Sequence, residues 1–283
     1  MGTYFVILTC RNSENTIREA INSLKDQTIT PEYIIVINDG STDKTANIVK
    51  DIQKLCDSLY LINHPDLGYD IKRVVKNWNE AICFSKIKQL QETEYHLIAT
   101  DDTIYCNDYI EKLIESMDLD PSIAITSGNY ASYVPIMPHG AGRLVRNSFL
   151  HESYWHGYYP EKMGYESAIL YEANRCGYKY AVLDDARFKH TKPLGKSHKF
   201  YEFGASMQTL GYHPIFALGR FFKYFLTGKV TGRVGAFYML YYYLSYKPKE
   251  EGYDSLYNKK IRQYVRRRQM KRLKKVLFNL KDL

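Results

Sequence analysis

Two acidic turns in this chain have the residue types and the spacing to bind a nucleotide and a metal ion. The first, Asn-Asp-Gly-Ser-Thr-Asp at residues 38–43, directly follows an apolar run. The second, Thr-Asp-Asp-Thr at residues 100–103, follows the apolar run 95–99. Carboxylate oxygens accept hydrogen bonds from N–H and hydroxyl groups, and they are ligands that Mg²⁺ and Mn²⁺ prefer. The two turns together indicate a nucleotide and a metal.

The elements that must hold these turns alternate between strand-like and helix-like segments. The strand-like runs are residues 4–9, 33–38, 59–62, 95–99, 123–127 and 179–183. The first helix-like segment has a stripe of apolar residues at helical spacing, Ile17, Ala20, Ile21 and Leu24. At its start, Thr16 and Glu19 have the spacing of a capping box. This alternation predicts an α/β fold with a mostly parallel sheet and helices on both faces.

The predicted sheet also predicts where a ligand binds. In an open parallel sheet, ligands lie outside the carboxyl ends of the strands, because helix N-termini and loop amides converge there. Asn12, Asp39 and Asp102 all follow predicted strands. We therefore expect these three residues at the same edge of the sheet.

Composition limits the class of protein. The chain has 283 residues, of which 45% are hydrophobic, so it can bury a full core. Its five cysteines are scattered singly, which favours neither a disulfide framework nor a zinc site. The N-terminus has no basic and apolar regions like those of a signal peptide. We expect a cytoplasmic globular protein.

The motifs resemble those of the family 2 glycosyltransferases, which have the GT-A fold, a Rossmann-like sheet, and use nucleotide-sugar donors. The first strand runs into Thr-Cys-Arg-Asn-Ser-Glu at residues 9–14, where the family has a Tyr-Asn-Glu-like turn. Residues 38–45 match its Asp-Asp-Gly-Ser-Thr-Asp-x-Thr signature except at Asn38. The resemblance implies that Asp39 accepts a hydrogen bond from the base or ribose of the donor, in a pocket lined by Thr9, Arg11 and Glu14. Lys72 and Arg73 fall where the family often has residues facing the donor.

The family's Asp-x-Asp signature is represented by residues 100–102, with Thr100 in the place of the first acid. The resemblance implies that Asp102 binds Mg²⁺ or Mn²⁺ and that Asp101 contacts the donor through the ribose or a water. It further implies that His190 reaches the metal or the diphosphate. Nearby candidates for phosphate binding are Lys192, Lys196 and His198.

A fourth resemblance concerns the acceptor side, at Gly164-Tyr165-Glu166-Ser167. The family has Glu-Asp in this place, and Ser167 stands where the Asp is usual. An inverting transfer requires a base that takes the proton of the acceptor hydroxyl, a task for a carboxylate. The resemblance therefore implies that Glu166 is this base, although an ordinary first-turn helix acid would look the same.

The C-terminal part has a different character, and we predict a catalytic domain over residues 1–204 and a helical extension over residues 205–283. The extension has aromatic and aliphatic runs that single basic residues interrupt, and neither run is long enough to span a bilayer. Eleven Lys and Arg residues then crowd residues 259–281 around an apolar stripe that includes Ile261 and Val265. Such a helix favours peripheral contact with an anionic membrane on its cytoplasmic face. The alternatives are packing on the protein itself or in a homo-oligomer; nucleic-acid binding is the least favoured.

These patterns predict an inverting glycosyltransferase that moves a sugar from a nucleotide donor, first of all a UDP-sugar, to a hydroxyl of a glycan or a lipid-linked acceptor. One alternative is a sugar-phosphate nucleotidyltransferase, whose usual glycine-rich loop is missing from residues 9–15. Another is a catalytically impaired GT-A scaffold that binds membrane or RNA, because Thr100 and Ser167 replace expected acids.

Overall fold

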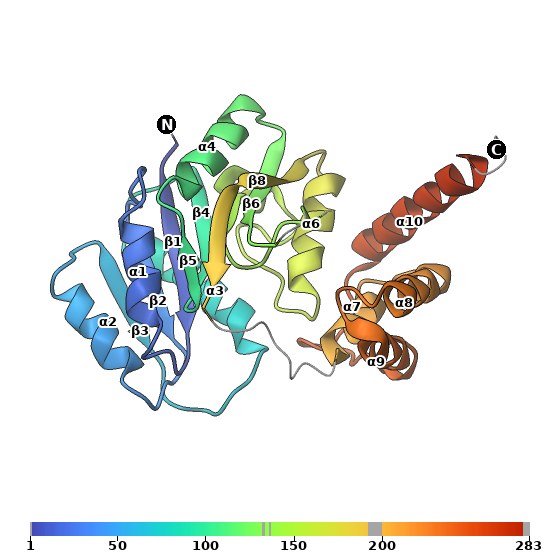
Figure 1. Ribbon diagram of the computed structural model, residues 1–283, viewed down its shortest axis with the longest axis horizontal. Helices are drawn as coiled ribbons and strands as arrows, with labels where there is room; N and C mark the ends of the chain where they lie inside the picture. The colour runs from blue at the N-terminus through green and yellow to red at the C-terminus, as the bar shows by residue number, and fades with distance from the viewer. Residues whose placement is uncertain (1, 132–133, 136, 192–199, 280–283) are drawn as a thin grey trace. The chain divides into compact units, whose positions relative to one another are not determined.

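The computed structural model describes residues 2–131, 134–135, 137–191 and 200–279, which form two compact units (Figure 1). The first unit comprises residues 1–159 and 176–194, and the second comprises residues 160–175 and 195–283. Residues 160–175, which include Glu166, group with the C-terminal helices by compactness. The predicted domain boundary after residue 204 stays a prediction.

A single eight-stranded sheet forms the centre of the first unit, in the order β3-β2-β1-β4-β7-β6-β8-β5. The strands are β1 (Tyr4–Cys10), β2 (Ile34–Asn38), β3 (Leu59–Asn63), β4 (Tyr95–Thr100), β5 (Thr103–Tyr105), β6 (Ile123–Asn129), β7 (Arg143–Arg146) and β8 (Lys179–His190). The neighbours β3, β2, β1 and β4 are parallel, whereas β7 runs antiparallel to both β4 and β6. The prediction of a mostly parallel sheet is confirmed, and all six predicted strands are present.

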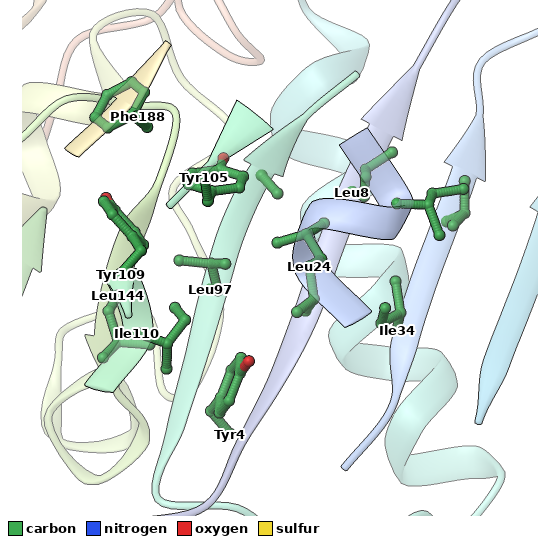
Figure 2. Close-up of a cluster of buried hydrophobic side chains, with 14 of the residues drawn as sticks. Tyr4, Leu8, Leu24, Ile34, Leu97, Tyr105, Tyr109, Ile110, Leu144 and Phe188 are labelled. Carbon is green, nitrogen blue, oxygen red and sulfur yellow. The ribbon is translucent and has the colours of Figure 1, made fainter. Parts of the chain in front are cut away.

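Helices cover both faces of this sheet. Successive side chains of a strand point to opposite sides, so each face has its own set of side chains to bury. The helices of the first unit are α1 (Ile17–Lys25), α2 (Thr45–Gln53), α3 (Arg73–Ile87), α4 (Tyr109–Leu119) and α5 (Asn147–Glu152). On one face, Tyr4 and Leu8 pack with Leu24 of α1 and Ile110 of α4 (Figure 2). On the other face, α3 contacts β1 and β2. Burial of such side chains is the main source of stability.

The start of α1 differs in part from the prediction. The apolar stripe is fully buried, as its spacing predicts. The predicted capping box is wrong, because the Thr16 side chain makes no capping hydrogen bond to the helix. Its hydroxyl instead donates to the carbonyl of Ser13, at 3.4 Å.

The second unit is helical and contains α6 (Tyr165–Arg175), α7 (Tyr201–Thr209), α8 (Pro214–Thr227), α9 (Gly232–Ser245) and α10 (Lys259–Asn279). Helices α7 and α8 both contact α9, and α10 contacts α6. The approach of α7 to α9 requires Gly204, since a Cβ atom there would lie 2.4 Å from the carbonyl oxygen of Met239. In the parts of the chain described above, we find no helix long and apolar enough to cross a membrane.

Helix α10 confirms the predicted basic helix but not its free apolar side. Ile261 and Val265 are buried, and the Gln269 side chain accepts a hydrogen bond from the backbone N–H of His213 at 2.9 Å. The Arg266 guanidinium donates to the carbonyl of Gly211 at 2.8 Å. This half of the stripe therefore packs on protein, and Ile261 and Val265 do not face a lipid surface.

Candidate active site

The carboxyl ends of three parallel strands bring the predicted donor residues to one edge of the sheet. Thr9 of β1 pairs with Ile37 of β2 on one side and with Thr100 of β4 on the other. The residues that follow, Arg11, Asp39 and Asp101, consequently leave the sheet at the same level. The backbone N–H of Arg11 donates to Oδ2 of Asp101 at 3.2 Å. The predicted convergence of these strand ends at one edge of the sheet is confirmed.

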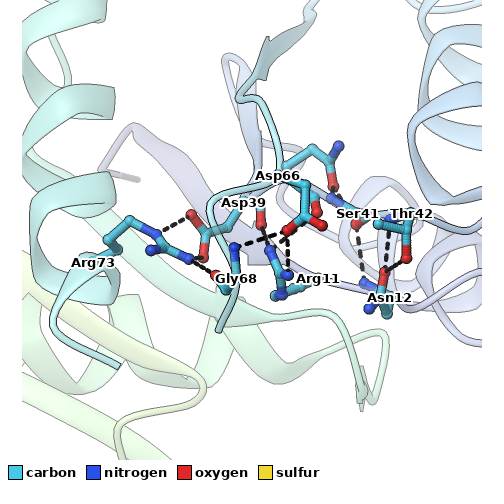
Figure 3. A network of polar contacts seen from close by, with 10 residues as sticks. Arg11, Asn12, Asp39, Ser41, Thr42, Asp66, Gly68 and Arg73 are labelled. Carbon is cyan, nitrogen blue, oxygen red and sulfur yellow. Dashed lines mark hydrogen bonds and ion pairs between the residues drawn. The ribbon is translucent and has the colours of Figure 1, made fainter. Parts of the chain in front are cut away.

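Asp39 forms a two-point ion pair with Arg73 at the start of α3 (Figure 3). The distances are 2.8 Å from Arg73 Nε to Asp39 Oδ1 and 3.1 Å from Nη2 to Oδ2. Arg73 also donates to the carbonyl of Gly68. The hydrogen bonds that Arg73 donates to Asp39 raise the pKa of Arg73. Only 14% of the Asp39 side chain and 20% of the Arg73 side chain are exposed.

Arg11 connects the loops that follow β1, β2 and β3. Its guanidinium donates to the carbonyls of Asp39 and Gly40, and it pairs with Oδ1 of Asp66 at 2.7 Å (Figure 3). The hydrogen bond from Arg11 lowers the pKa of Asp66 below its ordinary value. Arg11 therefore fixes the shape of the turn that presents Asp39.

The turn after β2 depends on Gly40 and Asn38. Gly40 has a φ of +65°, and a Cβ atom there would lie 2.5 Å from the carbonyl oxygen of Pro65. The Asn38 amide donates to Oδ1 of Asn63 at the end of β3, at 2.7 Å. A carboxylate in the place of Asn38 could not donate this hydrogen bond. Asn38 therefore ties the end of β2 to the end of β3 through its side chain.

Glu14 and Lys72 have different surroundings from Asp39. Oε2 of Glu14 accepts a hydrogen bond from the backbone of Lys44 at 3.0 Å, and the Glu14 N–H donates to Asp43 at 3.1 Å. These contacts hold the start of α1 against the start of α2. Lys72 is the residue before α3, and its backbone N–H donates to Asp70 at 3.0 Å. A donor-binding role for Glu14 and Lys72 stays a prediction.

Asp102, just after β4, and His190, at the end of β8, are brought together by the pairing of β5 with β8. Thr103 is the register partner of His190 in this antiparallel pair. Oδ1 of Asp102 lies 3.6 Å from Nδ1 of His190, and it accepts a hydrogen bond from the Thr100 hydroxyl at 3.0 Å. The Thr103 hydroxyl lies 3.1 Å from the same ring nitrogen. His190 is the last residue of β8, which extends beyond the predicted strand 179–183.

Asp102 and His190 present ligand atoms for a divalent ion that takes its remaining ligands from a diphosphate and water. Within the described ranges, no group of three or more His, Cys, Asp and Glu side chains is arranged to hold a metal by itself. Mg²⁺ typically takes one or two carboxylates from the protein and its other ligands from phosphates and water. Asp102 is one such carboxylate, and Nδ1 of His190 lies 3.6 Å from it.

Glu166 is exposed on the first turn of α6, in the second unit. The residues that meet at the carboxyl edge of the sheet all belong to the first unit. We call them the sheet-edge site: Arg11, Asp39, Arg73, Asp101, Asp102 and His190. Lys192, Lys196 and His198 lie outside the described residues. The roles of Glu166, Asp102, His190 and the donor residues stay predictions.

Several contacts at this edge of the sheet could not be predicted from the sequence. Thr103 belongs to the predicted acidic turn, but its contact with His190 had no sequence signal, because its three-residue strand has no recognisable period. Asp66 and Gly68, which hold Arg11 and Arg73, lie in a turn whose only signal was its Pro-Asp-Leu-Gly composition. The Tyr130 ring packs edge-on against His190, with 4.9 Å between ring centroids, and this contact had no sequence signal.

Relatives of known sequence match only part of the chain. A poly-beta-1,6-N-acetyl-D-glucosamine synthase of Staphylococcus epidermidis is 27% identical over 123 residues, which are 44% of this chain and 27% of that protein. An uncharacterized glycosyltransferase of Haemophilus influenzae is 31% identical over 131 residues, which are 46% of this chain and 36% of that protein. The matched region thus spans well under half the length of these relatives.

Solved structures share the fold over most of the chain. The mannosyltransferase PcManGT from Pyrobaculum calidifontis, in complex with GDP-Man and Mn²⁺, has a TM-score of 0.58 at 16% identity, with 86% of this chain and 70% of that chain covered. S. aureus TarS 1–349 in complex with UDP-GlcNAc has a TM-score of 0.54 at 19% identity, with 86% and 71% covered. The family model described as glycosyl transferase family 2 matches residues 5–166, more than half of the chain. With this match and a GT-A fold, the chain belongs to glycosyl transferase family 2.

Proposed function

We propose that the protein transfers a sugar from a nucleoside-diphosphate donor, first of all a UDP-sugar, to a hydroxyl of a glycan or lipid-linked acceptor. The observation that carries this proposal is the convergence of Asp39, Asp101 and Asp102 at the ends of neighbouring parallel strands. Structural neighbours with the same fold bind GDP-Man with Mn²⁺ or UDP-GlcNAc. A site of this kind needs a group that recognises the nucleoside and a group that holds the diphosphate.

Asp39 supplies the nucleoside contact in this proposal. A carboxylate has about four lone-pair sites on its two oxygens. Arg73 occupies one site on each oxygen, so both oxygens keep capacity for N–H or hydroxyl groups of the base or ribose. The ion pair fixes the orientation of the carboxylate before the donor arrives, which reduces the entropy lost on binding. Arg73 thus supports donor binding by positioning Asp39.

Asp102 and His190 would hold the metal ion, either Mg²⁺ or Mn²⁺. When bound, the ion neutralises the charge that develops on the departing nucleoside diphosphate. The Thr100 hydroxyl donates to Oδ1 of Asp102 and orients this carboxylate. Thr100 therefore has a supporting role in the place where the family signature has an acid.

Glu166 is the base of the proposed reaction. The acceptor oxygen attacks the anomeric carbon on the side opposite the phosphate, the bond from that carbon to the phosphate oxygen breaks, and the configuration inverts. The acceptor hydroxyl loses its proton to the Glu166 carboxylate. This assignment rests on the match of residues 164–167 to the family's acceptor signature and on the exposure of Glu166.

Incubation with Mn²⁺ and a panel of UDP- and GDP-sugars tests the reaction through slow hydrolysis of the donor. We expect hydrolysis with at least one donor and a loss of about 100-fold or more in Asp102→Asn, because a charge-neutralising ligand is removed. Glu166→Gln should abolish transfer to an acceptor and keep donor binding. Asp57→Asn and Glu115→Gln, which change exposed acids, serve as matched controls.

The same experiment separates a catalyst from an inactive scaffold, which the replacements Thr100 and Ser167 would favour. A scaffold would bind nucleotide and hydrolyse no donor, and its Asp102 and Glu166 variants would behave like the controls. Failure to bind any nucleotide sugar would contradict the proposed function altogether.

A further inference from the structure

The helical hairpin α8–α9 leaves an apolar stripe of α8 uncovered. Ile215, Leu218, Phe222 and Leu226 are exposed, and Leu226 is 72% exposed. Their spacing of three or four residues places them along one side of the helix. The buried side of α8 is a different one, with Ala217 and Phe221 facing the protein. One side of α8 therefore packs on protein, and a second apolar side is exposed to water.

Helix α9 has the same property beside it. Its exposed apolar and aromatic residues also follow helical spacing, and they are Val234, Phe237, Tyr238, Tyr241 and Leu244. The two helices contact each other (Figure 1). The centroids of the Phe221 and Phe237 rings lie 5.1 Å apart. Val230, in the connection between the helices, is 61% exposed. An exposed apolar surface of this extent marks an interaction site.

The segment that forms this surface carries charge of one sign. Residues 203–249 contain six Lys and Arg residues and no Asp or Glu. Lys223 is exposed next to Phe222, and Lys229 and Arg233 are exposed at the connection between the helices. Cations at the border of an apolar helix face, with aromatic residues among its apolar ones, are typical of helices that lie in a membrane interface.

We propose that the exposed face of the α8–α9 hairpin binds an anionic lipid surface. The helices lie in the plane of the interface, with Phe222, Leu226 and Phe237 at the boundary between headgroups and acyl chains and with the cations at the phosphates. This contact goes beyond the proposed reaction, because no residue of the sheet-edge site takes part in it. It also differs from the predicted contact through α10, whose residues Ile261 and Val265 are buried.

The charge pattern favours lipid over a second copy of the chain. In a symmetric dimer through this face, Lys223, Lys229 and Arg233 of one copy would approach the same cations of the other, and no acid lies within residues 203–249 to pair with them. An anionic bilayer supplies the missing negative charge. A lipid surface therefore provides apolar contact for the two stripes and negative charge for the cations.

Cosedimentation of the full chain with vesicles tests this proposal. We expect binding to vesicles of phosphatidylcholine mixed with phosphatidylglycerol, weaker binding to phosphatidylcholine alone, and weakening by salt. Phe222→Ser with Leu226→Ser should lower the partition constant by about tenfold to a hundredfold, because both side chains lose their apolar contact with lipid. Lys223→Gln and Lys229→Gln should each lower it about fivefold.

The control variants change exposed apolar and basic residues that lie outside the α8–α9 hairpin. Leu55→Ser with Leu119→Ser removes two apolar side chains that are each 87% exposed, and Lys50→Gln removes an exposed cation of α2. These variants should bind vesicles like the unaltered protein. All the substituted residues are exposed, so far-ultraviolet circular dichroism should show an unchanged fold.

Three outcomes would overturn the proposal. The first is no binding to anionic vesicles at low salt. The second is vesicle binding that survives Phe222→Ser with Leu226→Ser and is lost in Arg267→Gln with Lys271→Gln, two exposed changes on α10. The third is a dimer in sedimentation velocity that the Phe222 and Leu226 changes dissociate while vesicle binding is unaffected. Donor hydrolysis in the absence of vesicles should be equal in all these variants, so a failure here is distinct from a failure of the proposed reaction.

Discussion

His96 should make the protein sensitive to acid. The side chain is fully buried in β4, with Nδ1 at 2.6 Å from Oδ1 of Asn147 and Nε2 at 2.6 Å from the Tyr159 hydroxyl. The Asn147 amide nitrogen donates to the carbonyl of Thr93 at 2.8 Å, which directs its oxygen toward the ring. Nδ1 therefore carries the proton, Nε2 accepts from Tyr159, and the imidazole is neutral. Protonation would place a charge in the core where both ring nitrogens already have partners.

The pKa of His96 gives the size of the effect. Burial lowers this pKa from 6.5 to about 4. Between these two values the unfolded chain binds a proton that the folded chain does not bind, so the free energy of unfolding falls as the pH drops through this window. The gap corresponds to about 3 kcal/mol, a large share of the stability of an ordinary domain. The contribution is fully present above pH 6.5 and is lost by about pH 4.

Urea unfolding at a series of pH values between about 8 and about 4 measures this loss. The unaltered protein should lose about 3 kcal/mol more than His96→Gln, which has no titrating ring. His156→Asn changes an exposed histidine and keeps a residue type that tolerates its φ of +48°, so it should retain the full acid sensitivity. Should His96→Gln fail to fold, an NMR titration of the ring in the unaltered protein replaces it. A His96 ring that titrates near pH 6.5 would refute the reasoning.

Three further predictions concern the sheet edge. Asp39→Asn should weaken UDP binding by about tenfold to a hundredfold in calorimetry, because charge-assisted hydrogen bonds contribute about 1.5 to 3 kcal/mol; equal affinity would remove Asp39 from the donor site. Asp102→Asn should raise the Mn²⁺ concentration for half-maximal donor hydrolysis about tenfold or more, whereas an unchanged titration would assign the metal to other ligands. Gly40→Ala should lower the free energy of unfolding by about 2 kcal/mol, as its Cβ would overlap the backbone at Pro65; an unchanged denaturation midpoint would contradict the turn geometry.

Most of the sheet could be predicted because its central strands are buried on both faces. Runs such as 34–38 and 95–99 are almost wholly apolar and end at acidic turns. The same pattern predicted which edge carries the site, since only parallel order brings Arg11, Asp39 and Asp101 to one level. The family signatures then assigned roles that apolar periodicity alone could not provide.

The strands that were missed are short or irregular. β7, at residues 143–146, has two arginines in four positions, and β5 has only three residues. β8 continues past Asp184 and Asp185 to His190, although two adjacent acids interrupt its apolar pattern. Their pairing depends on tertiary contacts between distant segments, which a local pattern does not contain.

Arg11 has a consequence for attempts to alter the nucleotide preference of this protein. Its side chain holds the turns at Asp39 and Asp66, and its backbone holds Asp101 on the neighbouring strand end. A displacement of the turn at Asp39 would therefore be transmitted to Asp101 and to the turn at Asp66 through a single amino acid. Grafting the loops at residues 39–41 and 64–68 as one piece, with Arg11 retained, is the exchange that this connection permits.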